Sequence, residues 1–133
     1  MSYHAAVWLD YRQARIIGFD MHDADRAIQT VHGHGEPHIH HKAGVIGSGH
    51  THGDPAFFEA IADDLGDFQE ILVVGPAESK KALIAYLRRE RPELALHIAG
   101  SEALGQSSDG EIVAFAREFF RRTDRMTPQR RGS

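Results

Sequence analysis

Residues 70–76 read EILVVGP, in which four consecutive apolar residues are followed by a glycine and a proline. A continuous apolar run of this length that ends in a turn signal is typical of a strand buried on both faces. Such strands occur mainly in parallel sheets whose two faces are covered by helices. The run therefore predicts an α/β fold, with helical segments before and after it.

Helical patterns do flank the run. On its N-terminal side, Gly53-Asp54-Pro55 is a helix-start signal, because Asp54 can cap free backbone N–H groups and Pro55 suits the first helical position. The apolar residues that follow at helical spacing are Phe57, Phe58, Ile61, Ala62 and Leu65, and Gly66 suits the C-terminal stop. On its C-terminal side, residues 77–89 predict a second helix with Leu83, Ile84 and Leu87 facing inward.

The remaining C-terminal half continues this alternation. Residues 94–99, LALHIA, predict another strand, and a loop containing glycine and serine follows. Either Ser107 or Ser108 then begins a last helix. The apolar face of that helix consists of Ile112, Val113, Ala116, Phe119 and Phe120.

Three short segments precede the helices, at residues 5–10, 14–20 and 27–33, and short turns join them. They predict an antiparallel meander, whose third strand lies at an edge or has one solvent-exposed face. Strands joined by helices pair in parallel through right-handed crossovers. The order β-β-β, loop, α-β-α-β-α predicts an α/β domain of ribonuclease H-like topology, with helices on both faces of the sheet.

The composition is that of one ordinary globular domain of 133 residues. We expect residues 1–122 to form this domain, residues 33–53 to be a mobile loop within it, and residues 123–133 to be a basic flexible tail. The absence of cysteine excludes disulfides and thiol nucleophiles. Neither a signal peptide nor a membrane-spanning run is evident, so the expected location is the cytoplasm.

Residues 32–52 hold seven of the ten histidines, together with many glycines, and have no apolar period. A connection of this length in a small domain usually binds a ligand or is disordered. The charge is also uneven, because residues 117–133 carry +4 whereas the preceding 116 residues carry −8. A basic end on an acidic body can contact a polyanion, or it can be a solvated helix end.

Several stretches of the chain resemble a known family. Residues 7–17 (VWLDYRQARII), the Phe57-Phe58 helix, residues 71–78 (ILVVGPAE) and residues 108–117 (SDGEIVAFAR) are similar to the middle domain of archaeal and eukaryotic class-1 peptide-chain release factors and their Pelota relatives. They also resemble small bacterial proteins labelled translational machinery proteins. The resemblance spans about Ala5 to Phe120, and it implies a ribosome or another structured RNA as partner.

In the release factors, the loop before the first helix carries a Gly-Gly-Gln tripeptide. Here that place reads GVIGSGH, residues 44–50, without the glutamine, so peptidyl-tRNA hydrolysis is not carried over. What the resemblance implies is a flexible loop that faces RNA. We expect the protein to make this contact without catalysing a reaction and without a cofactor. The expected contact residues are His38, His40, His41, Lys42, Gly47, Ser48, Gly49 and His50, with Arg117, Arg121, Arg122 and Arg125 as an auxiliary basic group.

A metal site is the alternative for the same histidines. Residues i and i+2 of an extended chain point to the same side, so two imidazoles of a His-x-His pair can bind one zinc or another divalent ion. The pairs His32/His34, His38/His40 and His50/His52 would then serve a metal-dependent hydrolase. The pattern lacks a clear carboxylate partner for such an ion, so the RNA contact is the favoured interpretation.

A ribonuclease H-like nuclease is a further alternative, because such enzymes hold two divalent ions with carboxylates. Asp10, Glu59 and Asp109 occupy suitable elements, but the strand at residues 70–74 ends in Gly75-Pro76 where an acid is needed. We therefore interpret Asp10 as a turn residue, Glu59 as part of a solvated face and Asp109 as a helix N-terminal charge.

Three further histidines and the third strand complete the expectations. His97 is expected within a strand as a packed or edge residue, and His4 and His22 are expected at the surface. The third strand could pair with a second copy of the chain, which makes a homodimer one possible assembly.

Overall fold

The computed structural model describes residues 3–10, 12–22, 26–33 and 55–126. In these residues it contains a five-stranded sheet of order β3-β2-β1-β4-β5. Strands β1 and β2 and strands β2 and β3 pair antiparallel, whereas β4 pairs in parallel with both β1 and β5. The predicted antiparallel meander followed by parallel strands is confirmed. The strands are β1 (His4–Leu9), β2 (Gln13–Phe19), β3 (Arg26–His32), β4 (Glu70–Val74) and β5 (Ile98–Glu102).

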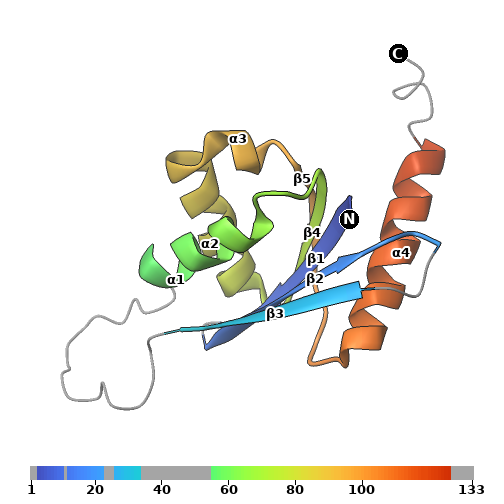
Figure 1. Ribbon diagram of the computed structural model, residues 1–133, viewed down its shortest axis with the longest axis horizontal. Coiled ribbons are helices and arrows are strands. Elements are labelled where there is room, and N and C mark those ends of the chain that lie inside the picture. The colour runs from blue at the N-terminus through green and yellow to red at the C-terminus, as the bar shows by residue number, and fades with distance from the viewer. Residues whose placement is uncertain (1–2, 11, 23–25, 34–54, 127–133) are drawn as a thin grey trace.

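Helices cover both faces of the sheet, as expected of this α/β fold. Figure 1 shows α1, α2 and the short α3 on one face and α4 on the other. Each face has its own hydrophobic core. The helices are α1 (Pro55–Leu65), α2 (Ala77–Glu90), α3 (Pro92–Ala95) and α4 (Asp109–Met126). Because α4 continues to Met126, residues 123–126, which were expected in the tail, are helical.

The central strand β1 contributes to both cores because successive side chains of a strand point to opposite faces. Val7 and Leu9 belong to the core under α1 and α2, whereas Ala6 and Trp8 belong to the core under α4. The run Ile71–Val74 of β4 is completely buried, which confirms the prediction of a strand covered on both faces.

Glycine is required where β4 ends. Gly75 has a φ of 128°, and a Cβ atom placed on it would lie 2.3 Å from the carbonyl oxygen of Leu9. Such a contact is far inside van der Waals distance. Any side chain at position 75 would therefore clash with β1 where the chain leaves β4, and only glycine fits. The Gly-Pro signal at the end of the run therefore has a steric cause.

The predicted strand at residues 94–99 is only partly correct. Residues 92–95 form α3, with Pro92 at its start and Leu94 buried, and β5 begins at Ile98. Proline at the first position favours a helical turn, and it prevails over the alternating pattern that suggested a strand. The strand also includes Gly100, where an added Cβ would lie 2.8 Å from Cζ of Phe119 in α4, so glycine allows α4 to approach β5 closely.

The structure corrects the strand expected at His97 and the surface position expected for His4. His97 lies in the turn between α3 and β5, where its carbonyl accepts a hydrogen bond from the N–H of Ile71 at 3.0 Å. His4 is half-buried in β1, and its ring centroid lies 4.7 Å from that of Phe120 and 5.8 Å from that of Phe19. Phe120 of α4 packs against this histidine, a tertiary contact that the sequence pattern alone does not show.

Candidate nucleic-acid interface

One edge of the sheet gathers the elements that border residues 34–54. Strands β1, β3, β4 and β5 end at this edge, and β2 begins there, as their pairing requires. Helix α2 begins directly after β4, and α1 begins at this edge and runs back to the start of β4 (Figure 1). We call this end of the sheet, where β1, β3, β4 and β5 terminate, the carboxyl edge. The opposite end of the sheet, where these four strands begin, is the amino edge. Both chain ends that border residues 34–54 thus lie at the carboxyl edge, at Gly33 and Pro55.

A turn at the carboxyl edge fixes the first of these chain ends. The Oδ1 atom of Asp10 accepts hydrogen bonds from the N–H groups of Arg12 at 2.8 Å and Gln13 at 3.0 Å. The N–H of Gly33 then donates to the carbonyl of Arg12 at 2.8 Å. Asp10 therefore serves the turn, as interpreted from the sequence. The side chains of Arg12 and His32 are both exposed beside this turn.

Arg15 and Trp8 connect the carboxyl edge to the start of α4, on the other face of the sheet. The Nη1 atom of Arg15 lies 2.9 Å from Oδ1 of Asp109, the first residue of α4, and its guanidinium carbon lies 5.3 Å from the Trp8 ring centroid. The Trp8 indole N–H donates to the carbonyls of Leu104 at 3.0 Å and Gly105 at 3.1 Å. These contacts connect β1 and β2 to the β5–α4 loop and to the start of α4 at the carboxyl edge.

A serine defines where α4 begins. The N–H of Glu111 donates to the Ser108 hydroxyl at 3.1 Å, and the Glu111 carboxylate accepts from the N–H of Ser108 at 2.8 Å. This reciprocal capping box satisfies two backbone donors that a helix start leaves unpaired. Of the two serines left open by the sequence, Ser108 is the cap, whereas the Ser107 hydroxyl donates to the carbonyl of Gly105.

The three carboxylates considered for a nuclease do not converge. Glu59 lies on α1 and Asp109 on α4, so the sheet separates them. Glu59 accepts hydrogen bonds from the Tyr86 hydroxyl at 2.6 Å and from Nη1 of Arg91 at 2.5 Å. Within the ranges that the structure describes, no group of three histidine, aspartate or glutamate side chains could hold a metal ion.

The hydrogen bond from Tyr86 to Glu59 has an electrostatic consequence. It raises the pKa of Tyr86 from 10.0 to about 12, because ionising the hydroxyl would remove the donor and place a negative charge beside the carboxylate. Arg91 also lies 3.3 Å from Asp63. This cluster clamps α1 to the end of α2.

The auxiliary arginines lie away from the carboxyl edge. Arg117 donates from Nε and Nη2 to the carbonyl of Asp20 at 3.0 and 2.7 Å, at the end of β2. Helix α4 is 18 residues, or roughly 27 Å, long and begins at the carboxyl edge, so its arginines lie toward the amino edge. Arg121 lies 3.9 Å from Glu118, and Arg122 is exposed. Arg125 belongs to α4, and nothing further is described for its side chain.

Most of the predicted contact residues lie outside the described part of the chain. Only His32, exposed at the end of β3, can be placed among the candidate ligands. The residues that cannot be placed are His34, His38, His40, His41, Lys42, Gly47, Ser48, Gly49, His50 and His52. Sequence reasoning missed Arg12, because its position beside Gly33 depends on how β3 returns to the first turn.

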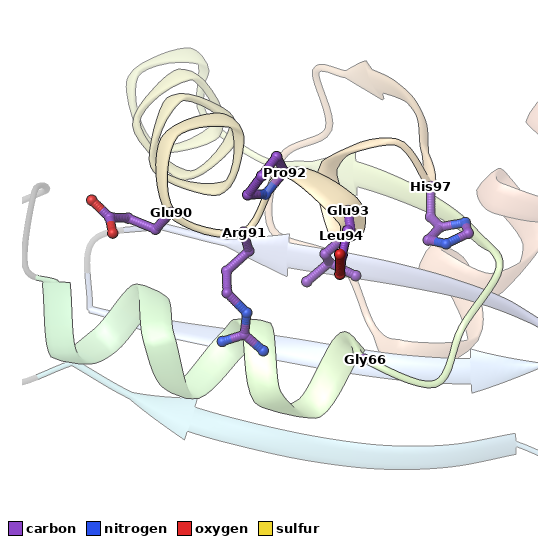
Figure 2. Close-up of a pocket in the computed structure, with 7 residues that line it drawn as sticks. All are labelled: Gly66, Glu90, Arg91, Pro92, Glu93, Leu94 and His97. Atoms are coloured by element: carbon purple, nitrogen blue, oxygen red, sulfur yellow. The ribbon is translucent and has the colours of Figure 1, made fainter.

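A cavity of about 450 Å³ lies at the amino edge, where α1 and α2 end. Figure 2 shows its lining, with Arg91 directed toward α1 and His97 on the opposite side. The residues that line it are Gly66, Glu90, Arg91, Pro92, Glu93, Leu94 and His97. Since Arg91 is already paired with Glu59 and Asp63, the cavity has no free arginine, and it is remote from the carboxyl edge.

The fold has solved counterparts. No protein-family model matches this chain, and neither does any curated protein sequence. The structure is similar to Pelota from Archaeoglobus fulgidus, with a TM-score of 0.60 and 13% identity over 86% of this chain and 30% of that one. It is likewise similar to Pelota from Thermoplasma acidophilum, with a TM-score of 0.58 and 17% identity over 86% of this chain and 31% of that one.

These similarities define the chain as an α/β domain with the fold of part of Pelota. At such identities the likeness establishes the fold alone. The chain spans about a third of the length of either Pelota protein. In the described residues, none of the helices is apolar over a length sufficient to cross a bilayer.

Proposed function

We propose that this protein is a non-enzymatic, ribosome- or RNA-associated module of translation that contacts RNA through its His/Gly-rich segment. The observation that carries the proposal is the Pelota-like fold over 86% of the chain, with the segment joined to its carboxyl edge. The resemblance of residues 7–17, 71–78 and 108–117 to the release-factor and Pelota family implies such a partner. A role of this kind would place the protein in the cytoplasm.

The charge distribution supports a local contact. Residues 1–116 carry −8, so the body of the domain repels a phosphate backbone. Attraction to RNA must therefore come from a small group of cations and stacking side chains. Lys42 and the imidazoles of His38, His40 and His41 would supply these groups, and Gly47 and Gly49 would let the backbone approach a phosphate closely.

Arg12 extends this proposed contact onto the described domain. Its side chain is exposed, and its carbonyl holds Gly33 at the point where the segment begins. We propose that Arg12 adds a positive charge for an RNA phosphate near the start of the segment. The arginines of α4 would meet only an RNA large enough to extend along that helix, and we propose them as a secondary contact.

Co-sedimentation with ribosomes at two salt concentrations tests the proposal. We expect His38, His40 and His41→Ala, made together, to weaken binding about tenfold, and Arg12→Ala to weaken it severalfold with a shallower salt dependence. The control is His22→Ala, because His22 is exposed and lies just beyond the end of β2 at the amino edge. Equal sedimentation of the wild type and the triple variant would contradict the proposed contact.

The same preparations test the metal-dependent alternative. Elemental analysis of protein purified without an affinity tag and dialysed against a chelator measures zinc and other divalent ions. Stoichiometric metal that is lost in the triple histidine variant, together with no ribosome binding by the wild type, would establish the His-x-His pairs as a metal site and overturn the RNA proposal.

A further inference from the structure

In the part of the chain that the structure describes, the outer edge of β3 has no partner strand. This strand is the last in the sheet on its side, and its seven residues pair with β2 in an unbroken register from Arg26 to His32. Residues 27–30 are all exposed. Among the described residues no strand pairs with the outer side of β3, so a row of main-chain donors and acceptors faces outward.

The hydrogen-bond pattern identifies which main-chain groups these are. The N–H of Gly33 donates to the carbonyl of Arg12, which makes these two residues a hydrogen-bonded pair of the antiparallel ladder. Since such pairs alternate along a strand, Val31, Gln29 and Ala27 direct their main-chain groups toward β2. The N–H and C=O groups of Ile28, Thr30 and His32 therefore point away from the sheet.

Between Arg26 and His32, the side chains of this edge lack the usual protection against pairing. Natural edge strands commonly carry lysine, proline or a bulge that prevents another strand from adding. Residues 27–31 read AIQTV, without a charge or a proline. Ile28 pairs with Ile17 of the core under α4, yet it is 43% exposed. The middle of the strand thus has the β-branched side chains of Ile28, Thr30 and Val31, without a lysine, a proline or a bulge.

From these observations we infer that β3 pairs antiparallel with β3 of a second copy of the chain, which joins two five-stranded sheets into one. The strand is self-complementary about Gln29. In that register Ile28 lies opposite Thr30 of the second copy, and the outward groups of both strands form up to about eight hydrogen bonds. No like charges face one another over residues 27–31, and Ile28 becomes covered.

The expected dimer is weak. Stable interfaces typically bury about 1,200–2,000 Å² in total, and two strands of this length alone bury less. We therefore expect a dissociation constant in the micromolar range, with monomer and dimer in rapid exchange. Sedimentation velocity from low micromolar to sub-millimolar concentration measures this equilibrium directly.

Thr30→Pro is the sharpest variant. It removes an N–H that points outward, so it leaves the hydrogen bonds between β3 and β2 in place, and proline is tolerated on such an edge. We expect it to weaken dimerisation at least tenfold. The control is Thr30→Val, which keeps the N–H and the β-branched shape and should dimerise like the wild type.

Ile28→Lys tests the same edge without changing the backbone. A lysine on each strand brings two like charges close together, and lysine on an edge strand opposes the addition of another strand. We therefore again expect the dimer to be weakened at least tenfold. The matched control is Ala114→Lys, which adds the same charge at an exposed position on α4. A wild type that stays monomeric throughout, or a dimer that neither Thr30→Pro nor Ile28→Lys weakens, would overturn the inference.

Amide hydrogen exchange by NMR gives an independent readout. In dilute protein the amides of Gln29 and Val31 should be protected and those of Ile28 and Thr30 should exchange fast. In concentrated protein all four should be protected. Protection of Ile28 and Thr30 that does not depend on concentration would show that the edge is covered within one chain, and it would overturn the inference equally.

Discussion

At the scale of single residues, Gly75 has little freedom to change. Its φ of 128° and the 2.3 Å approach of an added Cβ to the Leu9 carbonyl both oppose any side chain. We predict that Gly75→Ala lowers the free energy of unfolding by roughly 3–5 kcal/mol, because β4 and β1 would have to separate. Urea denaturation measures this change.

Gly105→Ala is the control for this prediction. Gly105 has no atom within 4 Å of an added Cβ, so alanine there should change stability by less than about 0.5 kcal/mol. Equal denaturation midpoints for the two variants would show that the close approach of Gly75 to β1 is not a constraint.

Tyr86 links stability to pH. The hydrogen bond to Glu59 raises its pKa to about 12, against 10.0 for an unperturbed tyrosine. Above pH 10 the unfolded chain therefore loses this proton before the folded chain does, so stability falls as the pH rises from 10 to 12. Below pH 10 the contribution is fully present.

We predict that Tyr86→Phe lowers stability by about 1 kcal/mol at neutral pH. It should also flatten the decline between pH 10 and 12, because the titrating hydroxyl is gone. Chemical denaturation at several pH values checks both effects. Tyr3→Phe, which removes a hydroxyl from an exposed ring and leaves Glu59 untouched, is the reference; an unchanged alkaline slope in Tyr86→Phe would refute the assignment.

At the scale of elements, α4 depends on the capping box of Ser108 and Glu111. We predict that Ser108→Ala lowers the free energy of unfolding by about 1 kcal/mol, because the N–H of Glu111 loses the hydroxyl that accepts its hydrogen bond. Ser107→Ala should have a smaller effect, since its hydroxyl bonds only to Gly105 within the loop. Thermal unfolding of the two variants distinguishes them, and a larger loss for Ser107→Ala would reverse the assignment of the cap.

The elements also show how far the sequence alone can predict this molecule. The buried run at residues 71–74 and the helices before and after it were predicted, and β3 was expected at an edge or with one solvent-exposed face, because each depends on the local pattern of apolar residues. The start of β5 was not, because Pro92 favours a helical turn and Gly100 extends the strand under Phe119.

The candidate site was predicted less well than the fold. The attachment of the His/Gly-rich segment after β3 follows from the order of elements, but the neighbours of Gly33 depend on tertiary pairing with the first turn. That is why Arg12 was missed. Arg117 looked like a free cation in the sequence, whereas the structure directs it to the carbonyl of Asp20.

At the scale of the whole molecule, the domain forms a rigid platform to which residues 34–54 are attached at one edge. Gly33 is fixed by Arg12, and Pro55 begins α1 at the same edge. Since the entropy of closing a loop depends only weakly on its length, we predict that a short Gly/Ser linker in place of residues 34–54 shifts the melting temperature by only a few degrees. The same variant should lose ribosome binding. Failure of this variant to fold would mean that the segment is part of the core.

The fluorescence of the Trp8 indole offers a way to follow unfolding and binding. It is the one tryptophan of the chain, it is 2% exposed, and its N–H is bonded to the loop that leads into α4. Its fluorescence should therefore be blue-shifted in the native protein and should move to longer wavelength on unfolding. Because the guanidinium of Arg15 lies over this ring at the carboxyl edge, we expect the emission intensity of Trp8 to change when a partner docks at that edge, without any attached dye.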